Sequence, residues 1–237
     1  MTSEVATPAE EEYIQMLFWL FEAGLPMTAA NLSRAMQLSA PTVHEMLGRL
    51  ERDGYVARNA ERTIEFTPEG RDHAERIVGR HRMIERFLTD VVGVAWDDVH
   101  EEAEHLEHAM TPRFEAYVRS AVGDAKTCPH GHPIRVGERI DGVPLADCEL
   151  GAQVMILRLE NEAEDLLHYL KEAGIEPGMQ GEIVANDGEL VTVRTEDQLA
   201  SITASVAETV SVIADPSPAP RIALPEQLVL GRERYGR

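Results

Sequence analysis

The chain has 237 residues, with 42 Asp and Glu against 22 Lys and Arg, and a formal net charge of −20. This length suffices for one large domain or two to three small ones, and no apolar run reaches the ~18 residues that a membrane span needs. The acidic start, MTSEVATPAEEE, lacks the apolar core of a signal peptide, and two cysteines do not make a disulfide framework. We therefore predict a cytoplasmic protein with no membrane partner.

The net charge neither supports nor excludes a nucleic-acid partner. Binding to phosphates needs Lys or Arg, and this chain has 20 Arg and only 2 Lys. An acidic, lysine-poor surface suits a salt-rich cytoplasm, where screening reduces self-repulsion. Codon bias in a GC-rich genome also depletes lysine, so a halophilic host stays a hypothesis.

The first seventy residues contain three predicted helices. Residues 11–23 show apolar side chains at a helical period. A second helix begins after the plausible N-cap Thr28, and a third, PTVHEMLGRLERDG, begins at Pro41. Because the small Ala35 stands where the last two helices could cross, we predict a helix-turn-helix.

Two strand-like stretches follow the third helix. YVAR, residues 55–58, and TIEF, residues 63–66, are joined by NAER, which is typical of a hairpin or wing. Thr67 and Pro68 then begin another helix. Three helices and a two-stranded wing together predict a winged-helix unit.

The side chains predicted to bind DNA lie at the two places where such a unit meets DNA. One group stands where the third helix would enter a major groove and could bond to phosphates or base edges; the arginines stand at the end of that helix or beside the wing. The predicted residues are Ser39, Pro41, Thr42, His44, Arg49, Arg52 and Arg62. Residues 1–70 hold only five Arg against eleven acidic residues, and a solvated surface role is the alternative for each arginine.

The segment HEEAEHLEHAM, residues 100–110, contains three histidines and four glutamates. Helical residues three and four apart share a face, so one stripe would present His100, Glu104, Glu107 and His108. Imidazole and carboxylate together suit divalent first-row metals. A solvated face of an acidic helix is the alternative. The preceding helix, residues 68–90, also carries a histidine and a glutamate four apart.

The remaining elements are a helix, a linker and a small β-rich part. The helix over residues 111–122 has an apolar stripe that could serve a partner subunit, and residues 133–147 read as a Gly- and Pro-bearing linker. A further helix, EDLLHYLKEAG, is expected among several strands. The expected strands are QVMILRLE, GEIVAN, LVTVRT and VSVIA. After Asp215 the Pro-containing tail favours a flexible extension.

The order of winged helix, RHRMIERFL, AWDDVHEEAEHLEH and CPHGHPI closely resembles the diphtheria-toxin-repressor family of metal-dependent transcription regulators. SAPTVHEMLGRLERDG is similar to that family's recognition helix. The resemblance covers residues 8–135 and continues more weakly to about residue 214. It implies a mainly α fold with small β elements. The implied parts are a winged helix-turn-helix (1–72), a helical dimerisation and metal-binding domain with linker (73–143), an SH3-like, FeoA-like β-barrel (144–215) and a flexible tail (216–237).

The resemblance also implies a primary metal site between the N-terminal helix and two dimerisation-domain helices. Its implied ligands are Glu12, His81, Glu104, Glu107 and His108. Iron-sensing members place Met and Cys where this chain has Glu12 and Glu104, whereas manganese-sensing members have carboxylates there. Hard oxygen ligands suit Mn²⁺. One departure is Gln15, where small manganese-sensing members carry a second carboxylate, and this argues against a tightly coupled two-manganese cluster.

An ancillary metal site is implied by positions that different branches of the family use. The candidate ligands are Glu85, His100, Cys128, His130, Glu160 and Glu162. Cys128 and His130 could equally pack within a turn. Of the two barrel carboxylates, either could reach the metal, and a charged loop is the alternative for both.

The function implied is a metal-dependent repressor of metal-uptake genes, with Mn²⁺ as co-repressor. Zn²⁺, Co²⁺, Ni²⁺ or Cd²⁺ could substitute in vitro. The expected partners are a second copy of the chain and double-stranded DNA with a pseudo-palindromic operator. The alternatives are an Fe²⁺-responsive repressor of the same family, a regulator whose metals are only structural, and a metal-dependent hydrolase. A zinc protease would need HExxH, which His100 and Glu101 begin but Glu104 does not complete, so we predict no enzyme.

Overall fold

The computed structural model describes most of the chain, namely residues 6–59, 63–135 and 137–215. Two compact units form, Met1–Arg80 and His81–Arg237. The predicted flexible tail, residues 216–237, lies outside the described residues. In the described ranges no helix combines the length and the apolar character that crossing a membrane requires.

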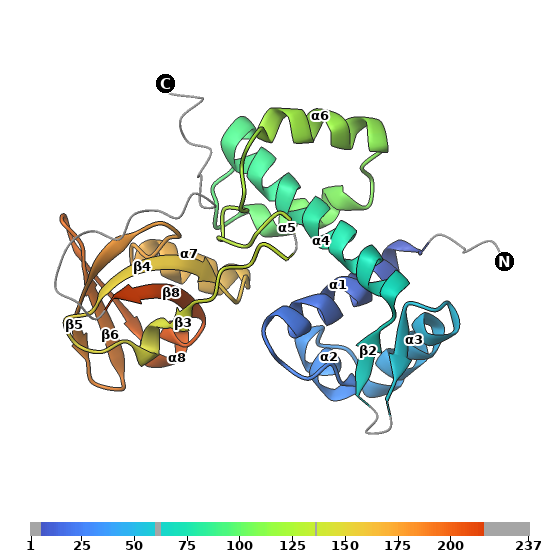
Figure 1. The fold of residues 1–237 in the computed structure, drawn as a ribbon, viewed down its shortest axis with the longest axis horizontal. Coiled ribbons are helices and arrows are strands. Elements are labelled where there is room, and N and C mark those ends of the chain that lie inside the picture. The colour runs from blue at the N-terminus through green and yellow to red at the C-terminus, as the bar shows by residue number, and fades with distance from the viewer. Residues whose placement is uncertain (1–5, 60–62, 136, 216–237) are drawn as a thin grey trace. The chain divides into compact units, whose positions relative to one another are not determined.

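The first unit is the predicted winged helix (Figure 1). Its elements are α1 (Pro8–Glu22), α2 (Ala29–Ala35), α3 (Ala40–Arg52), β1 (Val56–Arg58), β2 (Ile64–Phe66) and the first part of α4 (Pro68–Phe87). A Thr or Ser side chain accepts a backbone N–H at the start of each of the first three helices: Thr7, Thr28 and Ser39. Strands β1 and β2 pair antiparallel as the wing.

A small apolar core fixes these three helices against one another. Its fully buried side chains come from one face of each helix: Ile14, Leu17, Phe18, Leu32, Val43, Leu47 and Leu50. The turn between α2 and α3 contains Gln37 with φ of 54°, the left-handed region that non-glycine residues rarely occupy. The chain therefore reverses sharply before α3, which leaves the start of that helix exposed.

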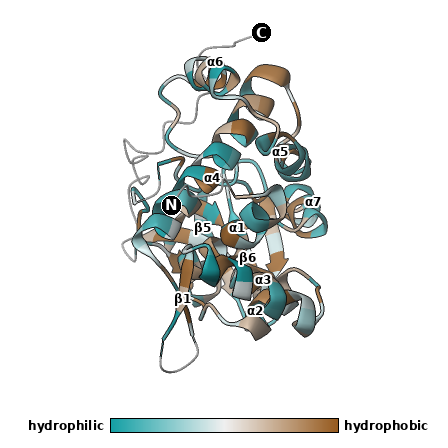
Figure 2. Cartoon of the chain, turned by 90° about the vertical axis from the view of Figure 1, so that its right-hand side faces the viewer, coloured by the Kyte–Doolittle hydropathy of each residue, from teal (hydrophilic) through white to brown (hydrophobic). Residues whose placement is uncertain are grey.

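The second unit begins with helices. They are the end of α4, a single π-helical turn η1 (Leu88–Val92), α5 (Val99–Glu107) and α6 (Pro112–Val122). Helix α4 carries both hydrophilic and hydrophobic bands along its length (Figure 2). Its apolar side packs with η1 and α5 through Ile84, Leu88, Val99, Ala103 and Met110. Gly93, with φ of 90°, ends the π-helical turn.

A six-stranded antiparallel sheet with order β3-β8-β4-β5-β6-β7 forms the rest of this unit. Its elements are β3 (Val143–Pro144), the 3₁₀ turn η2 (Leu145–Asp147), β4 (Gln153–Leu159), α7 (Glu164–Glu172), β5 (Gln180–Asn186), β6 (Leu190–Arg194), β7 (Leu199–Thr203), α8 (Ala204–Ala207) and β8 (Val210–Asp215). Register shifts between Ile156 and Arg158 and between Ile183 and Ala185 interrupt the ladders, as bulges do in strongly bent sheets.

The main apolar core of this β domain is closed by α7 through Leu167 and Leu170, and Met155 and Leu157 of β4 form a smaller buried cluster. The fold class is the predicted one, but two details differ. Strand β7 and the short α8 were not expected from the sequence. The predicted linker over 133–147 is wrong at its end, because β3 pairs with β8 there and Leu145 is buried in the core.

Candidate metal centre

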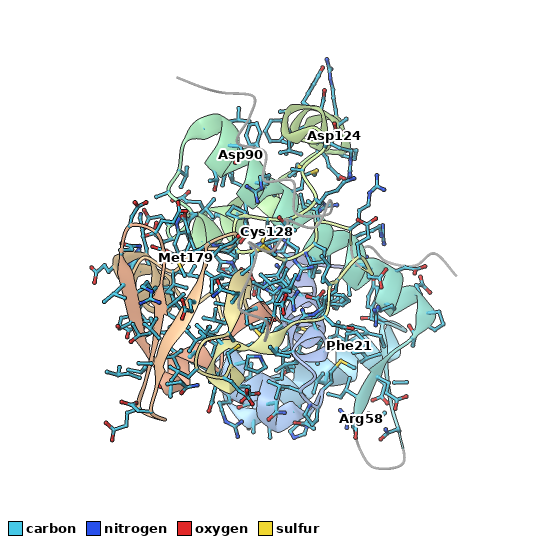
Figure 3. The ribbon with its side chains drawn as sticks, turned by 60° about the vertical axis from the view of Figure 1, so that its left-hand side comes forward. Phe21, Arg58, Asp90, Asp124, Cys128 and Met179 are labelled. Atoms are coloured by element: carbon cyan, nitrogen blue, oxygen red, sulfur yellow. The ribbon has the colours of Figure 1, made fainter. Side chains whose placement is uncertain are left out.

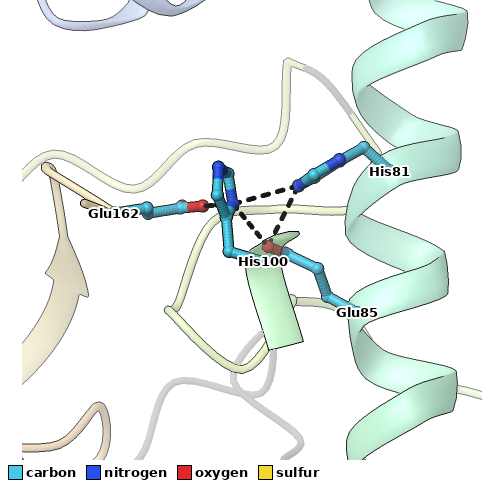
Figure 4. Close-up of side chains that lie close together, drawn as sticks. All are labelled: His81, Glu85, His100 and Glu162. Carbon is cyan, nitrogen blue, oxygen red and sulfur yellow. Dashed lines mark hydrogen bonds and ion pairs between the residues drawn. The ribbon is translucent and has the colours of Figure 1, made fainter. Parts of the chain in front are cut away.

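Three segments of the second unit bring together four side chains of the types that bind metal ions. Helix α4 supplies His81 and Glu85, helix α5 supplies His100, and the segment between β4 and α7 supplies Glu162 (Figure 4). One donor atom from each of these four residues lies within 4.8 Å of all the others. Only the i, i+4 pair on α4 is local in sequence, so the group depends on the β domain packing beside these helices.

The donors face one another at short distances. Glu85 Oε1 lies 3.0 Å from His81 Nε2 and 3.1 Å from His100 Nδ1. Glu162 Oε2 lies 2.8 Å from the same His100 nitrogen. His81 and Glu85 are buried, whereas His100 and Glu162 are half-buried. The cluster therefore has a buried floor and a partly open side.

A second group shares Glu85 and adds two residues from the loop after α6. Its members are Glu85, Cys128 and His130, all buried, with donor atoms within 4.8 Å of one another. Cys128 is labelled in Figure 3. The Nδ1 atom of His130 lies 3.2 Å from Glu85 Oε1 and 3.4 Å from Glu162 Oε2. The two groups therefore meet at the same pair of carboxylates.

Buried arginines of α4 hold this loop by its backbone. Arg86 donates to the carbonyls of Thr127 (2.8 Å) and Cys128 (2.7 Å), and Arg82 donates to that of Pro133 (3.0 Å). Gly131 has φ of 93°, and a Cβ there would lie 2.1 Å from the carbonyl oxygen of Leu157. Only glycine allows the loop to pass this close to β4.

The predicted primary ligands fall in both units. Glu12 is exposed on α1 of the first unit. In the second unit, His81 Nδ1 donates to Glu107 Oε2 (2.8 Å), and His108 Nε2 lies 3.2 Å from Glu107 Oε1. Glu104 is exposed and lies 3.5 Å from the Nε2 atom of His100. His81 therefore joins Glu107 to the Glu85 cluster through its two ring nitrogens.

The two barrel carboxylates have different surroundings. Glu162 faces the cluster, whereas Glu160 accepts hydrogen bonds from Arg139 (2.9 Å) and Arg158 (3.0 Å). Burial would raise the pKa of Glu160, but nearby cations outweigh it and lower that pKa to about 2. Glu160 is thus held in an ion-pair network, and Glu162 is the barrel carboxylate among the donors.

His132 is a cluster neighbour that sequence reasoning missed. Its Nε2 lies 3.2 Å from Glu162 Oε1 and 2.9 Å from the carbonyl oxygen of Leu159. A signal was present, because His132 stands two residues after His130 in the motif CPHGHPI. Glycine between the two histidines permits the turn that brings both to one side.

The carboxylates of the cluster favour the charged form of its histidines and raise their pKa values. Burial would lower the pKa of His81, but the carboxylates of Glu85 and Glu107 outweigh it and raise that pKa to about 9. Burial likewise opposes charge on His100 and His130, yet neighbouring carboxylates raise the pKa of each well above its usual value. The matching carboxyl pKa of Glu85 is well below its usual value, against the effect of burial.

These donors fit a divalent metal ion. Glu85 Oε2 is buried and has no hydrogen-bond partner among the described residues, which is costly unless something charged or polar satisfies it. Imidazole nitrogen and carboxylate oxygen are shared by Mn²⁺, Fe²⁺ and Zn²⁺ sites, whereas the Cys128 thiol favours softer ions. Burial raises the pKa of that thiol to about 11, so a metal would have to displace its proton.

The residues predicted to bind DNA lie mostly on the exposed start of α3. Ser39, Pro41, Thr42 and His44 are exposed, as is Arg52 at the end of the helix. The remaining two differ. Arg49 donates to the buried carboxylate of Glu10 (3.0 Å), and Arg62 lies outside the described residues. Ser39 also caps α3 by accepting from the backbone of Thr42, so it has a structural role.

A winged helix joined to helices with converging histidines and carboxylates defines the class of metal-dependent transcriptional regulators. Three family models match in order: the N-terminal DNA binding domain of iron dependent repressors (residues 6–64), their metal binding and dimerisation domain (67–135), and the FeoA domain (143–214). The diphtheria toxin repressor of Corynebacterium glutamicum is 32% identical over 195 residues, 76% of this chain and 86% of that protein. The chain belongs to the diphtheria-toxin-repressor family of iron-dependent repressors.

Other relatives agree in fold. The iron-dependent repressor IdeR of Mycobacterium tuberculosis is 30% identical over 199 residues, 77% of this chain and 86% of its own length. The crystal structure of IdeR from T. acidophilum has a TM-score of 0.73 at 26% identity, covering 90% of this chain and all of that one. A manganese-dependent repressor in complex with manganese has a TM-score of 0.76 over 86% of this chain and 99% of its own; at 24% identity it shows the fold alone.

The family assignment confirms several expectations from the sequence. The chain is a metal-dependent, DNA-binding repressor with a dimerisation domain and is not an enzyme, because the matched family consists of regulators. DNA and a second copy of the chain are its partners. An iron-dependent repressor is among its relatives, and a manganese-dependent repressor shares its fold.

Proposed function

We propose that this protein is a Mn²⁺-responsive repressor of metal-uptake genes that acts in the cytoplasm. Metal binding is supported by the convergence of His81, Glu85, His100 and Glu162, whose donor atoms lie within 4.8 Å of one another. These four residues would hold one divalent ion, and Cys128 and His130 would share it or hold another through Glu85. Bound metal supplies positive charge that neutralises the clustered carboxylates.

Preference for Mn²⁺ rests on the residue types at two of the primary ligand positions that the family resemblance implies, both outside the cluster of His81, Glu85, His100 and Glu162. Glu12 and Glu104 offer hard oxygen donors where iron-sensing relatives would have softer sulfur. Both side chains are exposed in the structure, so exchanging them disturbs no packed core. The Fe²⁺-responsive alternative remains the second candidate, because the Cys128 thiol lies beside Glu85.

Bound Mn²⁺ would act by shifting a conformational equilibrium of the protein. A ligand shifts a conformational equilibrium only by its differential affinity for the two states, and allosteric coupling is typically worth ~1–3 kcal/mol, or roughly 5–150-fold. We propose that Mn²⁺ favours the DNA-competent conformation of a homodimer. Its two α3 helices would then read half-sites about one DNA turn apart, which makes the operator a pseudo-palindrome.

Selection of operators from random duplexes tests this function. We expect the protein with Mn²⁺ to enrich a pseudo-palindromic sequence and the chelator-treated protein to enrich none. Enrichment of an equal sequence without metal would favour the regulator with purely structural metals. Failure to enrich any sequence with any divalent ion would contradict the repressor function itself.

A double exchange tests the metal preference. Glu12→Met with Glu104→Cys should shift the ion that activates DNA binding from Mn²⁺ towards Fe²⁺, because these changes replace hard donors by soft ones. Activation by each ion is measured without oxygen on the selected operator. Glu101→Gln, on the exposed side of α5, is the matched control. Unaltered selectivity in the double variant would mean that other ligands set the choice.

A further inference from the structure

A short segment before α5 connects the helices of the second unit with its β domain. The 96–98 segment contains Trp96, Asp97 and Asp98. Trp96 packs against the apolar core of the β domain. The two aspartates form ion pairs with α7, the helix that covers that core. The segment therefore attaches to the β domain by an apolar and an ionic contact together.

The ionic contact is centred on a buried carboxylate. Asp97 is 5% exposed and pairs with Lys171 on α7. His168, one turn earlier, lies 3.7 Å from Asp97 and 2.8 Å from Asp98. A buried carboxylate that loses its cation is left uncompensated, which is far more costly than the loss of an exposed pair. Removal of the Lys171 ammonium while Asp97 stays buried is correspondingly unfavourable.

Both ends of this contact adjoin proposed metal ligands. The carbonyl of Trp96 accepts a hydrogen bond from His130 Nε2 (2.7 Å). A carbonyl can only accept, so Nε2 keeps its hydrogen and Nδ1 is the ring atom left to face Glu85 and Glu162. On the other side, Glu162 lies two residues before the start of α7. Docking α7 against Asp97 thus places Glu162 as well.

We propose that the Asp97–Lys171 pair is a positioning contact that docks the β domain against the helices. By docking this domain, the pair sets the metal affinity of the cluster formed by His81, Glu85, His100 and Glu162. Neither residue is among the proposed ligands of that cluster. The inference rests on the proposed metal binding but goes beyond it, because it assigns control of affinity to an ion pair outside the ligand set. Loss of a partner bonded directly to a ligand typically weakens metal binding by ~10–100-fold; Asp97 contacts no proposed ligand, so we expect Asp97→Asn to weaken Mn²⁺ binding by about 10-fold, the lower end of that range.

Calorimetric titration of the full chain with Mn²⁺ alone measures this effect. The variants Asp97→Asn and Lys171→Met should bind Mn²⁺ more weakly than the parent. The conservative exchange Lys171→Arg keeps the positive charge and should retain near-parent affinity. Glu172→Gln, an exposed charge change on the same helix, is the control. Glu162→Gln identifies which binding event depends on the β domain. Thermal unfolding of each metal-free variant identifies any that fail to fold, and half-exposed Lys171 then supplies the test instead of Asp97.

The rate of lysine acetylation in the metal-free protein measures how firmly the β domain is docked. The chain has only two lysines, Lys126 and Lys171, so Lys126 serves as an internal reference. Asp97→Asn should speed acetylation of Lys171 relative to Lys126 and weaken the binding event that Glu162→Gln removes. Faster acetylation with unchanged Mn²⁺ affinity would overturn the proposal. Absence of Mn²⁺ binding in the parent would overturn the proposed function as well, whereas the acetylation result would still report the contact.

Discussion

Glu160 and Glu162 lie two residues apart yet face different partners. Glu160 is held by arginines and by a hydrogen bond from Ser211, while Glu162 faces His100, His130 and His132. Side chains two apart on extended backbone would share a face, but the strand β4 ends at Leu159. The chain turns there, and only Glu162 enters the cluster.

Because of this difference, exchanging Glu162 tests a proposed metal ligand, and the same exchange at Glu160 is its control. Glu162→Gln should lower Mn²⁺ affinity by more than the ~10–100-fold that an outer-shell loss typically costs, because it removes an ionised donor. Glu160→Gln makes the same chemical change in an ion-pair network and should leave the affinity within a few-fold of the parent. Calorimetric titration compares them. Equal losses in both variants would show that the effect comes from the β domain's stability.

The raised pKa values of the cluster histidines predict that metal binding depends on pH. The raised pKa of His81, about 9, means that a metal must displace its proton at neutral pH. Mn²⁺ affinity should therefore rise as pH rises from 6 towards 9, and titrations in buffers of different ionisation enthalpy should count released protons. Affinity that stays flat across this range would show that the histidines are already neutral before metal binds.

At the scale of elements, periodicity predicted the helices and left long-range placement open. Helices α1, α2, α3 and α6 begin at Thr or Ser N-caps, whereas α5 has no side-chain cap and its spacing alone predicts it. Strand β7 was missed because Leu199 is exposed and only Ala200 and Ile202 are buried, a weak alternating signal. The spacing of the motif CPHGHPI marks His132 as a candidate beside His130, but its approach to Glu162 depends on the packing of this loop against β4, and the sequence alone does not predict that packing.

The loop that carries Cys128 and His130 passes close to the backbone of β4 at Gly131. Gly131→Ala should destabilise the protein by several kcal/mol, because it adds a clash with the backbone of β4 to the ~1–2 kcal/mol cost of a left-handed residue. It should also weaken Mn²⁺ binding. Gly137 has the same φ of 93°, and a Cβ added there would have nothing within 4 Å. Gly137→Ala therefore has the backbone cost alone. Chemical denaturation compares the two; similar losses would mean that the loop can move away from β4.

For the whole molecule, the net charge of −20 must coexist with DNA binding. Each phosphate neutralised by a cationic side chain contributes roughly −0.9 to the salt slope, whereas salt also screens repulsion over ~8–10 Å. DNA affinity should therefore fall less steeply with salt than for a basic repressor with the same contacts. Arg52, exposed at the end of α3, is the cation expected to contribute.

A salt series at saturating Mn²⁺ measures this slope for the parent and for Arg52→Ala. The variant should bind DNA more weakly and should have a slope shallower by about 0.9 if Arg52 meets one phosphate. A steep, monotonic loss of parental affinity, like that of a strongly basic repressor, would show that the acidic surface lies too far from DNA to matter.

Metal occupancy of the second unit is proposed to control DNA binding by the first. Fluorescence anisotropy of a labelled operator, measured over a range of free Mn²⁺ concentrations, tests it most directly. We expect affinity for the operator to rise by roughly 5–150-fold on saturation with Mn²⁺, and Glu104→Ala to remove this rise while the protein stays folded. Equal operator affinity with Mn²⁺ and with chelator would contradict control of DNA binding by the metal.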